Sequence, residues 1–134
     1  MFRTLIVEDN AAFRQSFREI LHMRFPHMLV DEAPDGEQAL QKIDSFRPEL
    51  VFMDIVLPGE NGLEVTKKIK TGYPAITIII LTNYDLPEYR DAANQYGANY
   101  FISKGSSSRD EILTLVESIL SDRGFDPDGQ KGTE

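Results

Sequence analysis

Five side chains that could hold a metal ion and a phosphoryl group stand at or just after the ends of short apolar runs. They are Glu8, Asp9, Asp54, Thr82 and Lys104. Carboxylate oxygens suit a hard divalent cation such as Mg²⁺, which prefers octahedral oxygen coordination and keeps several of its waters. A hydroxyl and an ammonium group can donate hydrogen bonds to phosphoryl oxygens as charge redistributes during a transfer. These residue types are therefore those that a magnesium-dependent phosphoryl site needs.

Alternating strands and helices would have to position this set. Apolar runs at residues 4–7, 28–30, 50–53, 76–81 and 100–102 are each followed by apolar positions at helical spacing. Strands that are apolar on both faces and are joined by crossover helices are typical of a parallel sheet covered on both sides. We therefore predict an α/β fold, a doubly wound (βα)5 domain with a five-stranded parallel sheet. In such sheets ligands bind at the carboxyl ends of the strands, where the five side chains stand.

Each of the five residues also has an ordinary explanation when it is taken alone. Asp54 could be a solvated loop carboxylate, Thr82 could simply end a strand, and Lys104 could lie on the surface. A helix N-terminus favours negative charge and could account for Asp9. The adjacent carboxylates of Glu8 and Asp9 repel each other, however, and chance would seldom place such a set at four strand ends on one edge of a sheet.

Composition narrows the class of protein. The 134 residues include 14 Lys and Arg against 22 Asp and Glu, so the formal net charge is −8 and opposes non-specific binding to nucleic acid or anionic lipid. With no cysteine and only two histidines, a metal site would have to use oxygen ligands. The start lacks the apolar run of a signal peptide, and the longest apolar stretch, near residues 75–81, is too short to cross a bilayer. We therefore expect a cytoplasmic protein without a membrane segment.

The periodic pattern ends near Leu120. The last helix carries an apolar stripe over residues 112–120, and Ser108 with Glu111 ahead of it matches a capping box. The residues that follow have too little apolar surface to offset the entropy of ordering them. We predict one domain over residues 1–121, with residues 122–134 forming a flexible tail or the start of a linker.

In type and place, the five residues resemble the functional set of the receiver domain of two-component response regulators, over roughly residues 3–120. The turn after Asp54, with Pro58 and Gly62, is similar to the acceptor loop of that family. The resemblance implies a flavodoxin-like strand order 2-1-3-4-5 and a phosphoacceptor role for Asp54. It also implies that Asp9, Asp54 and the main-chain carbonyl of Val56 hold Mg²⁺, or another divalent ion such as Mn²⁺, with Glu8 assisting directly or through a water molecule.

Further roles follow from the same resemblance. Lys104 would pair with the phosphoryl group, and Thr82 would donate to one of its oxygens. Phe101, three residues before Lys104, stands at the family's switch-aromatic position and would turn inward when Thr82 moves, although it lacks the hydroxyl of the commoner tyrosine.

The resemblance also implies partners. A histidine kinase or phosphotransfer protein would supply the phosphoryl group and dock on the first helix, residues 11–25. The output face would comprise residues 89–96, 100–103 and 112–120, through which a homodimer could form. The chain would not be an enzyme beyond its own phosphorylation and slow dephosphorylation, and its output would control transcription.

Three departures from the family pattern matter for function. Gly105 follows Lys104 where most members have proline, so the peptide bond there should be trans and the loop looser; this is similar to regulators with a helix-turn-helix output domain. Asn83 replaces a very small residue and could narrow access to Asp54. Val56 and Tyr84 offer no carboxylate or amide to position a hydrolytic water, which predicts slow self-dephosphorylation.

Alternative functions fit the residues less well. A flavin-binding domain can share the sheet order, but the acidic residues after the first strand would repel its phosphate. A Walker-type nucleotide hydrolase needs a G-x-x-x-x-G-K-[ST] run, which the sequence lacks. An enzyme acting on an external substrate would need a further base at the strand ends. The remaining alternative is a receiver-like binding module that works without phosphorylation.

Overall fold

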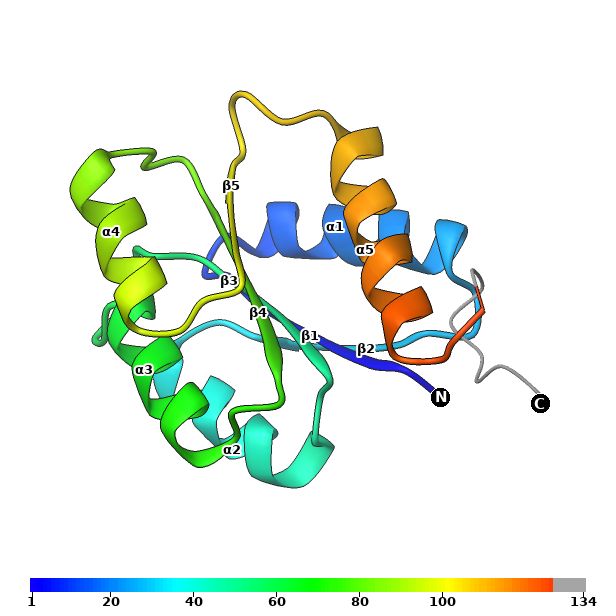
Figure 1. Cartoon of the computed structure of the whole chain (residues 1–134), viewed down its shortest axis with the longest axis horizontal. Helices are drawn as coiled ribbons and strands as arrows, with labels where there is room; N and C mark the ends of the chain where they lie inside the picture. The colour runs from blue at the N-terminus through cyan, green and yellow to red at the C-terminus, as the bar shows by residue number, and fades with distance from the viewer. Residues whose placement is uncertain (127–134) are drawn as a thin grey trace.

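The computed structural model describes residues 1–126, in which strands and helices alternate as predicted (Figure 1). In chain order the elements are β1 (Arg3–Val7), α1 (Ala11–Arg24), β2 (Leu29–Ala33), α2 (Gly36–Phe46), β3 (Leu50–Met53), α3 (Gly62–Gly72), β4 (Thr77–Thr82), α4 (Pro87–Gln95), β5 (Tyr100–Ser103) and α5 (Arg109–Asp122).

The five strands form one parallel sheet in the order β2-β1-β3-β4-β5, which confirms the predicted topology. Val7 lies opposite Met53 in the register of β1 and β3, and Thr82 lies opposite Ser103 in that of β4 and β5. The residues that directly follow β1, β3 and β5 therefore emerge at the same edge of the sheet. These are Glu8, Asp54 and Lys104.

Helices cover both faces of the sheet. Figure 1 shows α1 and α5 on one side and α2, α3 and α4 on the other. Side chains alternate along each strand, so Leu5 and Val7 pack in the cluster with α2 and α3, whereas Ile6 packs in the cluster with α1 and α5. The strands are consequently buried on both faces, as their continuous apolar runs predict.

The second strand differs from its prediction. The apolar run at residues 28–30 marks only its start, because the strand begins at Leu29 and continues through Asp31 and Glu32 to Ala33. These acidic residues remain in an edge strand because cations on neighbouring helices pair with them. Lys42 of α2 lies 2.6 Å from Asp31, and Arg14 of α1 lies 2.8 Å from Glu32.

Polar side chains define where the helices begin. Asn10 and Asp35 accept hydrogen bonds from the main chain of the first turns of α1 and α2. Ser108 and Glu111 form the predicted capping box at the start of α5. These caps place each helix directly after a loop at the carboxyl edge of the sheet, where the candidate site lies.

The chain after α5 contacts the domain. Arg123 donates to the carbonyl of Ala75 and, at 3.0 Å, to the hydroxyl of Thr77, and the ring of Phe125 meets that of Phe2 edge-to-face at 5.1 Å. The rest of the predicted tail, residues 127–134, lies outside the described residues. Within residues 1–126, no helix has both the length and the apolar character needed to cross a membrane.

Candidate phosphoryl and metal site

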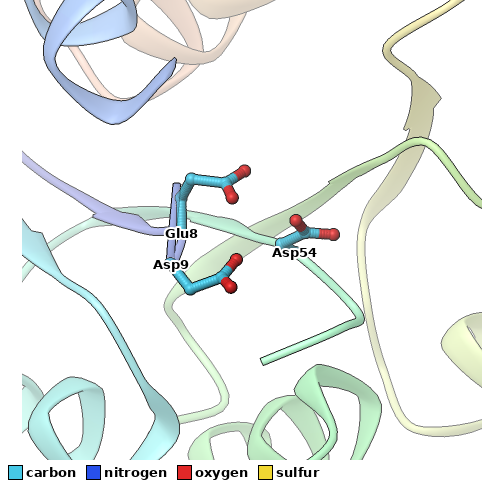
Figure 2. A group of neighbouring side chains, drawn as sticks. All are labelled: Glu8, Asp9 and Asp54. Atoms are coloured by element: carbon cyan, nitrogen blue, oxygen red, sulfur yellow. The ribbon is translucent and has the colours of Figure 1, made fainter. Parts of the chain in front are cut away.

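Three carboxylates converge at the carboxyl edge of the sheet. Glu8 and Asp9 extend from the end of β1 on the side that faces Asp54, which follows β3 (Figure 2). Each residue offers an oxygen within 4.8 Å of those of the other two. Glu8 is 3% and Asp54 8% exposed, whereas Asp9 is open to solvent.

The ammonium group of Lys104 joins this cluster from the end of β5. Its Nζ lies 2.5 Å from Oε1 of Glu8 and 3.4 Å from Oδ2 of Asp54, and its side chain is only 12% exposed. The main-chain N–H of Lys104 donates to the carbonyl of Thr82 at 2.8 Å, which ties the start of this loop to β4. The structure thus brings together residues that are up to 96 positions apart in the sequence.

Negative charge exceeds positive charge at this cluster. Burial raises the pKa of Glu8 above its ordinary value, and it outweighs the opposing hydrogen bonds from Lys104 and the amide of Asn10. The cluster holds three carboxyl groups against the one ammonium group of Lys104. An all-oxygen donor set with this excess charge fits a hard divalent cation.

Asp54 is held by the main chain on one side only. The Ile55 N–H donates to Oδ1 at 2.7 Å, which leaves Oδ2 on the side of Lys104. Gly62 at the start of α3 packs so closely that a Cβ there would lie 1.8 Å from the carbonyl oxygen of Asp54. Any side chain at this position would collide with the main chain of Asp54, so the first residue of α3 has to be glycine.

Thr82 ends β4 beside Lys104, and Phe101 lies further back in β5. Thr82 is fully buried, and its hydroxyl oxygen accepts a hydrogen bond from the Tyr84 N–H at 3.2 Å. Phe101 packs against the core cluster on the α4 side and is partly buried, with the guanidinium of Arg90 4.6 Å from its ring centroid. Thr82 therefore contacts the loop before α4, and Phe101 contacts α4 itself.

The loops around the site carry the variable positions singled out in the sequence. Val56 and Tyr84 are each 48% exposed, and Asn83 is exposed as well. No peptide bond among residues 1–126 is cis, so the bond between Lys104 and Gly105 is trans, as predicted. The rim beside Asp54 is accordingly apolar and aromatic at Val56 and Tyr84.

Two residues of α1 contact the site, although the sequence did not indicate that they would. The Nζ of Lys104 lies 4.0 Å from the ring centroid of Phe13, and Arg14 donates to the main-chain carbonyl of Glu8 at 2.6 Å. In the sequence Phe13 is part of an apolar helical stripe and Arg14 is an ordinary surface position. Only their place in the first turn after the acidic pair could have indicated that they reach it.

Comparison with known proteins shows what this chain is similar to. The family model of the response regulator receiver domain matches residues 4–117. The oxygen regulatory protein NreC of Staphylococcus carnosus is 34% identical over 127 residues, which cover 93% of this chain and 58% of that protein. NreC of Staphylococcus haemolyticus is 34% identical over 118 residues, covering 87% and 54%. The chain therefore spans a little over half the length of these relatives.

Solved structures give the same result. A CheY-like receiver domain protein from Methanospirillum hungatei superimposes with a TM-score of 0.84 at 28% identity, covering 92% of this chain and 96% of that one. A LuxR-family two-component regulator from Aurantimonas sp. superimposes with a TM-score of 0.81 at 29% identity, covering 98% of this chain and 88% of that one. The response regulator TrrA from Thermotoga maritima, in complex with Mg²⁺ and BeF, superimposes with a TM-score of 0.79 at 34% identity. The match covers 90% of this chain and 100% of that one.

Proposed function

The chain belongs to the response regulator receiver domain family, and on that premise we propose that Asp54 accepts a phosphoryl group from a histidine kinase in a magnesium-dependent step. The family assignment makes the chain a signalling module of a two-component system. The acceptor, the ligands and the output face are our proposals.

The observation that carries the proposal is the convergence of three carboxylates around one ammonium group. Within this set Asp54 has one oxygen fixed by the Ile55 amide and the other 3.4 Å from Lys104. Glu8 is more deeply buried and already holds Lys104 and the Asn10 amide. Asp54 is therefore the carboxylate best placed to present an oxygen to an incoming phosphorus atom.

The donor set supports a magnesium site. Asp9, Asp54 and the main-chain carbonyl of Val56 would hold the ion, and Glu8 would assist directly or through a water molecule. A bound divalent cation would offset the excess negative charge that otherwise repels an anionic phosphodonor. That TrrA, at 34% identity, was solved with Mg²⁺ and BeF supports the same ion here.

Asp54, Lys104 and Thr82 each have a separate role in the transfer. The Oδ2 atom of Asp54 forms a bond to phosphorus as the bond between phosphorus and the donor imidazole nitrogen breaks. Lys104 turns from Glu8 and Asp54 to a phosphoryl oxygen of the new acyl phosphate. Thr82 gives up the hydrogen bond that it accepts from the Tyr84 N–H, and its hydroxyl group donates a hydrogen bond to a second phosphoryl oxygen.

Movement of Thr82 would carry the signal to α4, β5 and α5. The Tyr84 amide belongs to the loop that leads into α4, so releasing it frees that loop to rearrange. Phe101 would turn inward, and the exposed surface of α4, β5 and α5 would contact the output partner. Likeness to a LuxR-family regulator supports transcription as the output of a longer protein, in the cytoplasm, where a kinase and its ATP are available.

Intact mass spectrometry with acetyl phosphate tests the proposal. Wild-type chain in Mg²⁺ should gain one phosphoryl group, and Asp54→Asn or addition of a chelator should abolish the adduct. Asp44→Asn, a change of an exposed aspartate at the far end of α2, is the matched control and should leave the adduct unchanged. Failure of wild-type chain to form the adduct with both acetyl phosphate and a histidine kinase would favour a binding module that works without phosphorylation.

A further inference from the structure

Lys104 has a third partner that carries no charge. Its Nζ lies 4.0 Å from the ring centroid of Phe13, in addition to its contacts with Glu8 and Asp54. An ammonium group over an aromatic face is attracted by the negative potential of the ring, and the attraction strengthens when water is excluded. Because the side chain of Lys104 is only 12% exposed, this contact is largely shielded from solvent.

The ring of Phe13 is itself fixed in place. Phe13 lies in the first turn of α1, where its N–H donates to the side chain of the N-cap Asn10 at 3.0 Å. It stacks on Phe17 at 5.9 Å with an interplanar angle of 15°, and Phe17 meets Phe52 edge-to-face at 4.8 Å. Phe52 belongs to β3 and precedes Asp54 by two residues. The three rings therefore connect the face under Lys104 to the strand that carries Asp54.

Lys104 needs such a support because its own loop holds it weakly. Gly105 follows it, and a Cβ at Gly105 would meet nothing within 4 Å. The main chain of Lys104 is tied to Thr82 by one hydrogen bond, beyond which a lysine has a flexible four-carbon stem. Its carboxylate partners belong to the proposed cation site, so they cannot serve Lys104 alone.

We propose that Phe13 is a positioning residue that holds the ammonium group of Lys104 over the acceptor carboxylate. This inference deepens the proposed function and rests on it. The ring attracts the ammonium without adding negative charge, so it does not repel the phosphodonor as a further carboxylate would. When Glu8 turns to a bound cation, the ring remains as a partner that keeps Lys104 from swinging into solvent. Phe13 acts through Lys104 and does not touch the phosphoryl group.

Four variants separate this role from ordinary packing. Phe13→Leu keeps an apolar side chain but removes the ring, and Phe13→Tyr restores a ring. Phe46→Leu makes the same change at a partly buried phenylalanine at the end of α2, remote from Lys104 in the fold, and is the matched control. Lys104→Met assigns the lysine signal and provides a background in which the ammonium is absent.

Nuclear magnetic resonance reads the contact without any phosphorylation. Protons on Cε of Lys104 should be shifted upfield by the ring current in wild type, Phe13→Tyr and Phe46→Leu, and should return to their ordinary position in Phe13→Leu. Signals at the ordinary position in the wild-type chain would overturn the proposal. This arm decides the Phe13–Lys104 contact even if Asp54 proves not to accept a phosphoryl group.

The rate of phosphorylation with acetyl phosphate and Mg²⁺ tests what the contact between Phe13 and Lys104 does for the reaction. Phe13→Leu should phosphorylate between about twofold and about thirtyfold more slowly, the range expected for losing a cation–π contact, while Phe13→Tyr and Phe46→Leu stay near the wild-type rate. In the Lys104→Met background, Phe13→Leu should slow the residual reaction no further. An equal slowing in that background would show that Phe13 acts through packing and would refute the positioning role.

Discussion

At the scale of single residues, Lys104 contacts both buried carboxylates of the site. It is the only ammonium group among the described residues that contacts Glu8 or Asp54, and it does so from a different strand. We predict that Lys104→Ala slows phosphorylation of Asp54 by roughly 100-fold, the typical loss for one donor to a developing charge, without abolishing it. The adduct should then fail to alter the amide spectrum of residues in α4 and β5. A full wild-type spectral change in phosphorylated Lys104→Ala would contradict the role assigned to the ammonium.

We expect the side chains at the rim of the site to set the lifetime of a phosphoryl group on Asp54. Val56 and Tyr84 are exposed beside Asp54, and neither has a carboxylate or amide that could orient a water molecule for attack. We predict a half-life of minutes or longer at room temperature. Mass spectrometry measures it as the loss of the adduct after the phosphodonor is removed. Val56→Gln should shorten the lifetime by roughly 100-fold, the lower end of what a well-placed proton-transfer group contributes, because the amide can orient a water molecule but is a poor base. A wild-type half-life of seconds would rule the prediction out.

Residue types and strand ends were enough to predict which side chains gather. Glu8, Asp9, Asp54 and Lys104 lie together because parallel strands end at a common edge, and this follows from the sequence pattern alone. Their roles in phosphoryl transfer stay predictions. Phe13 could not be found in this way, because a phenylalanine in an apolar helical stripe looks the same whether its ring meets the core or a lysine.

At the scale of elements, Glu32 shows how charge holds β2 against α1. Burial tends to raise the pKa of Glu32, but hydrogen bonds from Arg18 and Arg14 outweigh it and hold the pKa below its ordinary value. A depressed pKa means that folding favours the ionised form, so this stability is present above pH 4.5 and is lost as the pH falls below it. The apolar run alone could not predict that β2 extends over Asp31 and Glu32, because the stabilising cations come from other elements.

We therefore predict that Glu32→Gln lowers the free energy of unfolding at pH 7 by about 1 kcal/mol, as expected for a partly exposed pair. The difference from wild type should shrink as the pH falls through the range below 4.5, where both proteins carry an uncharged side chain. Urea unfolding at several pH values measures it. Glu19→Gln, on an exposed residue of α1, is the control and should show no such pH-dependent difference. An identical loss at pH 7 and pH 3 would show that the charge is not responsible.

At the scale of the whole molecule, the two core clusters lie on opposite faces of the sheet. The sheet separates α1 and α5 from α2, α3 and α4, and β5 is its edge strand on the α4 side. The site lies at the carboxyl edge of the sheet, and the hydrogen bond from the Tyr84 N–H to Thr82 connects it to the loop before α4. Next to this loop, Arg90 of α4 pairs with Asp85 at 2.5 Å and covers the ring of Phe101. These contacts link the β4–α4 loop, α4 and β5.

This continuity predicts that phosphorylation changes self-association through the face of α4, β5 and α5. Tyr100 on β5 is 41% exposed and is an aromatic side chain of the kind that anchors interfaces. We expect the phosphorylated chain to form a dimer in sedimentation analysis, whereas unphosphorylated chain and Asp54→Asn stay monomeric. Tyr100→Glu should still be phosphorylated but should weaken association at least tenfold, or about 1.4 kcal/mol, because the introduced charges would face each other across a symmetric contact. Leu29→Glu, on a side chain of β2 that is 40% exposed at the opposite edge of the sheet, is the control for added charge and should dimerise as wild type does. If Tyr100→Glu also dimerises as wild type does, β5 is not part of the contact.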